Sequence, residues 1–153
     1  MKQGALIAFL LLVSGICAGT VRADLDGPLP PESDSARRVA LEPLFEKDGA
    51  RGEAILRARA GGQTEIEVGV KGLKPNAVYT IWAVQEHPFS VIIAIGSEDN
   101  AFQTDSLGEG RIVAIVSSLG LSKWQKLQIA QHADGNPKNL KGMRIALTGD
   151  LNR

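Results

Sequence analysis

The stretch that decides the fold is Gln63–Gln85, which reads QTEIEVGVKGLKPNAVYTIWAVQ. Gln63–Val70 alternates, so that its β-branched side chains share one face while Glu65 and Glu67 occupy the other. A period of two predicts a half-buried strand. Ala77–Gln85 is apolar on both faces, which predicts a second strand in a central position.

Further short runs of apolar and β-branched residues lie on both sides of this pair. They are Arg38–Phe45, Glu53–Ala60, Ser90–Ile95, Ala101–Thr104, Arg111–Ser117, Lys126–Gln131 and Gly142–Leu151. Leu119–Gln125 fits either a helical turn or a loop. About seven to nine short strands at regular spacing predict an all-β domain, an Ig-like Greek-key β-sandwich spanning residues 37–153.

The connection between the two central strands, Gly72–Tyr79, carries a motif with a physical rationale. Pro75 presets a turn, and Asn76 tolerates an unusual backbone conformation. Tyr79 can then bury its ring and direct its hydroxyl to an upstream backbone group, as in the tyrosine corner of Greek-key sandwiches. The motif therefore predicts a corner that stabilises the crossover between strands.

A longer stretch resembles a known class of exported module. GLKPNAVYTIWAV, followed by FQTDSLGEGRIVAIV, is similar to the outer β-sandwich domain of anti-sigma-factor proteins and to other exported Ig-like modules. The Leu-x-Pro-x-x-x-Tyr spacing also resembles the corner of fibronectin type III modules. The similarity covers roughly residues 61–117. Much of the chain follows the corner, and neither an inner-membrane helix nor a sigma-binding domain precedes it, so the resemblance implies a fold and not an activity.

The N-terminus is typical of a secretory signal. Lys2 is followed by the apolar run Ala5–Cys17, and Val21–Ala23 has the small-residue spacing that signal peptidase requires. The run is shorter than the roughly 20 residues that span a bilayer. We therefore expect residues 1–23 to be a signal peptide, residues 24–36 a proline-rich flexible linker, and the protein to be exported to the periplasm or the extracellular space.

Cysteine usage limits the chemistry of the exported form. Cys17 is the only cysteine and lies within the predicted signal peptide. The processed chain would therefore hold no disulfide, thiol nucleophile, thiolate zinc site or blue-copper site with a Cys ligand. Cys17 as a lipid anchor is an alternative, although Ile16 stands where lipoprotein signals have a small residue.

Charge excludes one large class of partner. The chain has 17 basic and 17 acidic residues, and loss of Lys2 and Arg22 with the signal would leave 15 against 17. This balance is not the electrostatic footprint of a nucleic-acid-binding protein. Basic residues at 51, 57, 59, 71 and 74 alternate with glutamates at 53, 65 and 67, which predicts a solvated strand face of mixed charge. We expect no integral membrane segment after signal removal.

Two histidines are the main candidates for metal chemistry. His87 and His132 each follow a predicted strand, beside Glu86 and Asp134 respectively. The four would form a metal site only if the two strand ends met in space; otherwise they are surface or turn residues. The acidic loops Glu98–Asn100 and Asp134–Asn136 lack the spacing of a calcium loop, and turn formation explains both.

No catalytic signature is present in the sequence. It contains no nucleophile elbow, P-loop, dinucleotide fingerprint or HExxH motif. Ser117, Ser118 and Ser122 have no base nearby in sequence. Trp82 is expected in the core, and Trp124 either covers the open end of the sandwich or is an exposed binding anchor.

These observations favour an exported, non-catalytic β-sandwich of the cell envelope, with no cofactor and no metal. It would bind a protein, an envelope component or a small ligand through its end loops, Gln85–Ser90, Gly96–Asn100 and His132–Lys141. The first alternative is a periplasmic metal-binding protein using His87 and His132. The second is a hydrolase-type enzyme whose site is dispersed over distant loops.

Overall fold

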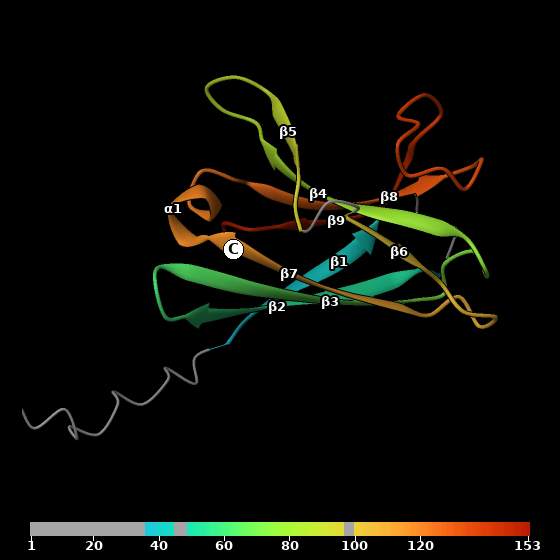
Figure 1. The fold of residues 1–153 in the computed structure, drawn as a ribbon, viewed down its shortest axis with the longest axis horizontal. Coiled ribbons are helices and arrows are strands. Elements are labelled where there is room, and N and C mark those ends of the chain that lie inside the picture. Colours follow the sequence, from blue (N-terminus) through green and yellow to red (C-terminus); the bar gives the residue numbers. More distant parts are fainter. Residues whose placement is uncertain (1–35, 45–48, 97–99) are drawn as a thin grey trace, which may run out of the picture.

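The structure is a computed structural model that describes residues 36–44, 49–96 and 100–153. The elements are β1 Arg37–Pro43, β2 Arg51–Arg59, β3 Gln63–Lys71, β4 Val78–Gln85, β5 Val91–Ala94, β6 Ala101–Gln103, β7 Gly110–Ser117, α1 Ser118–Leu121, β8 Lys126–His132 and β9 Arg144–Asp150 (Figure 1). The prediction of an all-β domain is confirmed. The expected signal peptide, nearly all of the expected linker, and Cys17 lie outside the described residues. No helix among the described residues is long and apolar enough to cross a membrane.

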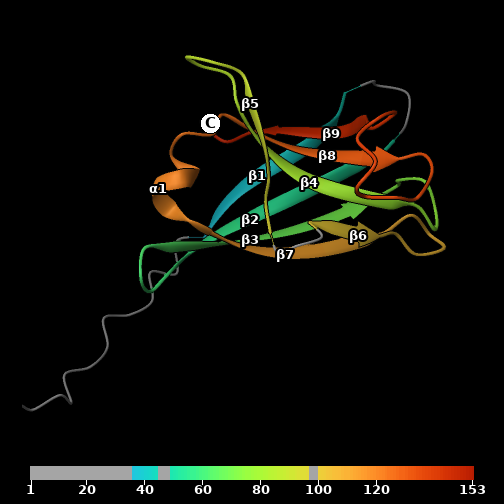
Figure 2. The same ribbon diagram turned by 45° about the horizontal axis from the view of Figure 1, so that its top comes forward.

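The strands form one antiparallel sheet that curls on itself. The order is β5-β4-β8-β9-β1-β2-β3-β7, and β6 pairs with β4 on the edge that β5 also uses. β1 belongs to both halves of the sheet, because it pairs with β2 as far as Leu41 and with β9 from Glu42. The curl places β2, β3 and β7 below β4, β8 and β9 (Figures 1 and 2). The Ig-like Greek-key arrangement stays a prediction.

The core lies between the two halves, as the alternation of β3 predicts. Thr64, Ile66, Val68 and Val70 are buried, and Glu65 and Glu67 lie on the outer face. β4 is the central strand that its composition predicts, with partners on both edges and both faces buried. Tyr79, Ile81 and Ala83 belong to the main core, whereas Thr80, Trp82 and Val84 are covered on the opposite face.

The tyrosine corner is formed as the sequence predicts. The Lys74 N–H donates a hydrogen bond to the hydroxyl of buried Tyr79 at 3.0 Å, and Asn76 has a φ of +51°. Burial raises the pKa of the Tyr79 hydroxyl. The Tyr79 ring stacks on Phe102 of β6, with ring centroids 5.7 Å apart. The corner therefore joins β3, β4 and β6 at one end of the sheet.

The β6–β7 loop is docked against this corner. The Asp105 carboxylate accepts hydrogen bonds from the N–H groups of Leu107 and Glu109, both at 2.8 Å. The Gly108 carbonyl accepts a hydrogen bond from the N–H of Leu73. Gly108 has a φ of +74°, and a Cβ there would lie 2.0 Å from the Leu73 carbonyl oxygen. Only glycine fits at this position, which fixes the loop beside the ends of β3 and β7.

Candidate functional site

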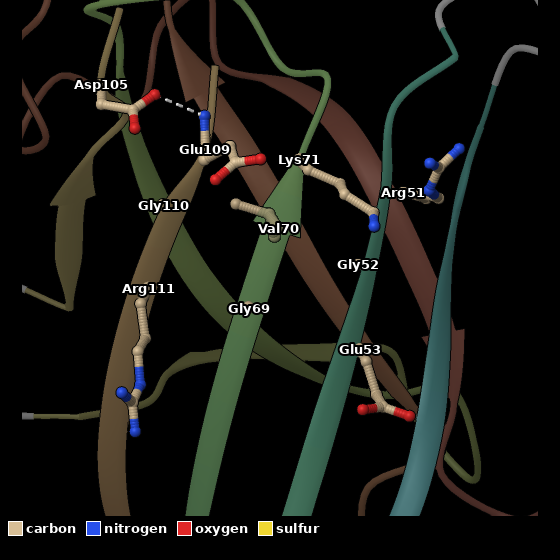
Figure 3. A pocket seen from close by; sticks show the side chains of 10 residues that line it. All are labelled: Arg51, Gly52, Glu53, Gly69, Val70, Lys71, Asp105, Glu109, Gly110 and Arg111. Atoms are coloured by element: carbon tan, nitrogen blue, oxygen red, sulfur yellow. Dashed lines mark hydrogen bonds between the residues drawn. The ribbon is translucent and has the colours of Figure 1, made fainter. Parts of the chain in front are cut away.

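A hollow of about 740 Å³ lies over the ends of β2, β3 and β7, beside the β6–β7 loop (Figure 3). Its floor is open because of one glycine. Gly69 on β3 stands in register between Glu53 on β2 and Arg111 on β7, and no atom lies within 4 Å of where its Cβ would be. A missing side chain in the middle of a strand row therefore exposes the backbone to a ligand.

Most charged groups around the hollow already have partners. Arg111 forms an ion pair with Glu67 at 2.7 Å, and Glu53 forms one with Arg38 at 2.6 Å. The Asp105 carboxylate caps the β6–β7 loop. These groups surround the hollow, but each would have to give up its ion pair or hydrogen bonds before it could bind a ligand.

Two cations at the rim of the hollow, Arg51 and Lys71, differ from these groups because they have no ion-pair partner among the described residues. Arg51 of β2 lies directly opposite Lys71 of β3 in the antiparallel register. Neither forms an ion pair with any residue in the described part of the chain, and both are exposed. Residues directly opposite have Cβ atoms roughly 5 Å apart, and like charges in such positions destabilise a sheet. The pair therefore places two positive charges together at the rim of the hollow, where an anion is a suitable ligand.

The rest of this outer face is a network of ion pairs, as the charge pattern predicts. Arg57 contacts Glu67 at 2.8 Å and Glu65 at 3.4 Å, and Arg59 also pairs with Glu65. The hydrogen bond from Arg57 holds the pKa of Glu67 below its usual range, and the charge of Arg111 acts in the same direction. Opposite charges therefore neutralise each other along the face, except at Arg51 and Lys71.

The histidines do not converge. His132 pairs with Val78 at the first residue of β4, whereas His87 follows Gln85, the last. At about 3.3 Å per residue, the strand separates them by roughly 25 Å. The described residues contain no group of three or more His, Cys, Asp or Glu that could hold a metal ion. The alternative of a metal site using both histidines is wrong, because the two residues lie beside opposite ends of β4.

His132 instead has a structural partner set. It is only 2% exposed, and its Nδ1 lies 3.1 Å from the Asn139 carbonyl oxygen. Because a carbonyl only accepts, Nδ1 carries the proton in the neutral ring and Nε2 accepts from the Thr80 hydroxyl at 2.8 Å. Trp82 donates its indole N–H to the same hydroxyl at 2.7 Å. This network joins the 132–141 loop to the covered face of β4.

The remaining predicted residues have ordinary roles. Asp134 caps its own turn, and hydrogen bonds from the Asn139 side chain and the Asn136 N–H lower the pKa of its carboxyl. Glu98 and Asp99 lie outside the described residues. Trp82 and Trp124 are both buried, so Trp124 covers the core and is not an exposed anchor. Ser118 bonds to Thr64, and Ser122 donates to the Leu119 carbonyl.

The end loops predicted to bind a partner differ in how much exposed surface the structure describes for them. Gln85–Ser90 contains the exposed Phe89, while Gly96–Asn100 is described only at its two ends. The hollow, lined by residues 51–53, 69–71, 105 and 109–111, was missed by sequence reasoning. The signal was the isolated Gly69 within an alternating strand, together with the register set by the 60–62 turn. In comparisons with known proteins, the chain matches no family model and no curated sequence.

Proposed function

We propose that the chain is an exported, non-catalytic β-sandwich module of the cell envelope that binds an acidic group of a protein or envelope component. The binding site is the hollow at the ends of β2, β3 and β7. The observation that carries the proposal is the pair Arg51 and Lys71, directly opposite each other and without ion-pair partners in the described chain.

The chemistry of the rim suits a single carboxylate or phosphate. Arg51 can donate two parallel hydrogen bonds to such a group, and Lys71 adds a compact positive charge. An anion between them converts like-charge repulsion into two attractive contacts. The floor at Gly69 lets the ligand approach the strand backbone.

The acidic neighbours limit the class of ligand. Glu109 and Glu53 also line the hollow, so a dense polyanion would meet repulsion on two sides. One acidic group attached to a neutral or basic remainder fits the arrangement better. The side chain of an acidic residue in a partner protein, or one phosphate of an envelope component, has this character.

The cellular setting is part of the same proposal. Residues 1–23 have the pattern of a secretory signal, and the remainder is free of cysteine. The similarity of residues 61–117 to exported Ig-like modules, including the outer domains of anti-sigma-factor proteins, supports a Greek-key sandwich. The tyrosine corner at Tyr79 is the element of that similarity with a defined contact.

For the test, the full-length chain is expressed, and the protein is purified as the cells process it. Inorganic phosphate and the capped peptide acetyl-Gly-Glu-Gly-amide, which carries a single carboxylate, are titrated while backbone amide shifts are followed by NMR. We expect shifts at Gly69–Lys71 in the wild type and their loss in Arg51→Gln/Lys71→Gln. Arg37→Gln/Lys123→Gln removes two exposed cations outside the hollow and should behave like the wild type. No response in the wild type, or equal responses in both double variants, would contradict the proposal.

A further inference from the structure

The β4–β5 hairpin ends in a free strand edge. β5 is the last strand in the sheet order and pairs only with Trp82–Gln85 of β4. The hairpin projects away from the two halves of the sheet in both ribbon views (Figures 1 and 2). One backbone edge of β5 therefore has no strand beside it in the described part of the chain.

This edge is apolar and unprotected. Val91, Ile92 and Ile93 are 41%, 53% and 40% exposed, and Phe89 at the hairpin tip is 77% exposed. Successive side chains point to opposite faces, so both faces of the strand are partly exposed. β5 carries no charge, proline or bulge, which are the usual devices against edge pairing. Such a strand marks an interaction site.

The hydrogen bonding of β5 defines which backbone groups are available. The Ile95 N–H donates to the Ile81 carbonyl oxygen on β4. Because residues alternate along an antiparallel strand, Ile93 and Val91 also direct their backbone groups toward β4. The N–H and C=O groups of Ile92 and Ala94 therefore point away from it. They are the donors and acceptors that a further strand would use.

We propose that β5 pairs antiparallel with β5 of a second copy of this chain, about a two-fold axis through Ile92. In this register Ile92 faces its own counterpart, and Val91 faces Ile93 of the second copy. The outward backbone groups of Ser90, Ile92 and Ala94 then meet those of the second copy's Ala94, Ile92 and Ser90. The register pairs outward-pointing groups only and uses the whole strand.

A second copy fits this edge because the edge is self-complementary. A two-fold contact places each residue against the same surface of the other copy, and an uncharged strand then sets no like charges opposite each other. The exposed side chains, at on the order of 100 Å² each, would bury on the order of 800 Å² over both copies, below the about 1,600 Å² of a standard interface. The dimer is therefore weak and reversible.

The test measures self-association by sedimentation velocity, from about 10 μM to about 1 mM. The wild-type chain should shift from monomer toward dimer as concentration rises. Ile92→Lys and Ile92→Glu should each stay monomeric, since both place like charges on the axis, and an equal mixture of the two should dimerise. Leu107→Lys, at a 74% exposed apolar residue in the β6–β7 loop, should associate like the wild type.

Cross-linking tests the register separately. In a Cys17→Ser background, Ile92→Cys should form a covalent dimer under mild oxidation, because hydrogen-bonded opposite residues have Cα atoms about 5.5 Å apart, within disulfide reach. Leu107→Cys should not. A wild type that stays monomeric at 1 mM, Ile92→Lys dimers, or a Lys/Glu mixture without association would overturn the proposal. Capture of a different apolar strand by a monomeric chain would count against it as well. The residues differ from those of the hollow, so either proposal can fail alone.

Discussion

Replacement of Gly69 by valine should change the stability of the fold and ligand binding at the hollow in opposite directions. Gly69 lies in the interior of β3, without a positive φ, and has no atom within 4 Å of its Cβ position. A β-branched side chain therefore enters open space on the outer face, between Glu53 and Arg111. The same atoms fill the floor of the hollow that the proposed ligand needs.

The magnitude follows from the strand environment. Glycine within a strand costs roughly 0.5–1 kcal/mol relative to alanine, and β-branched residues gain a further fraction of a kcal/mol. We expect Gly69→Val to raise the free energy of unfolding by about 1 kcal/mol and the midpoint of thermal unfolding by about 4 °C. Binding of inorganic phosphate or of acetyl-Gly-Glu-Gly-amide should fall at least about tenfold, which corresponds to about 1.4 kcal/mol.

Circular dichroism melts and NMR titrations on the same samples measure both quantities. Gly62→Val is the matched control, because Gly62 also has an open Cβ position but a φ of +69° in the β2–β3 turn. It should lose stability and keep binding. A Gly69→Val variant that melts lower than the wild type would refute the packing argument. One that binds phosphate as well as the wild type would refute the location of the site.

Three further substitutions test the fold and its ion pairs. Gly108→Ala should lower the free energy of unfolding by about 3 kcal/mol, because its Cβ overlaps the Leu73 carbonyl at a positive φ; chemical denaturation measures this, and a loss below about 1 kcal/mol would contradict it. Tyr79→Phe should cost about 1–2 kcal/mol in the same assay, since the Lys74 N–H loses its partner, and an unchanged midpoint would contradict the corner's role. The pKa of Glu67 is lowered in the folded state, so its contribution to stability is present above the ordinary glutamate pKa and is lost as the pH falls through the folded value. Arg57→Gln should therefore reduce the loss of stability as the pH falls below the ordinary glutamate pKa, and parallel pH profiles for the two proteins would contradict the pairing.

Local pattern was enough to predict the strands and the corner. The alternation of Gln63–Val70 defines both the strand and its buried face, since any slip of one residue would bury Glu65 and Glu67. Pro75, Asn76 and Tyr79 act within one turn, so their geometry depends on near neighbours. The burial of Trp82 follows similarly from a strand that is apolar on both faces.

Long-range pairing was not predictable in the same way. β1 passes from one half of the sheet to the other between Leu41 and Glu42, which depends on pairing with β9, a strand more than 100 residues away in sequence. The separation of His87 and His132 depends on both flanking the same strand, one beside its start and one beyond its end. Neither relation has a local signature, and for this reason the metal hypothesis could not be decided from spacing.

The rim of the hollow is an intermediate case. The 60–62 turn places Arg59 opposite Gln63, and each step away from the turn keeps the pairing, so Arg51 falls opposite Lys71. The register of one hairpin therefore sets the two cations together, and the glycine two residues before Lys71 opens the space beside them. β5 and β7 are the two ends of the sheet order. β5 pairs with Trp82–Gln85, at the far end of β4 from the corner beside which the hollow lies. A two-fold contact through β5 would therefore leave the hollow on each copy open, and a dimer would present two sites for acidic groups to a partner surface, where the second binding event gains from the first.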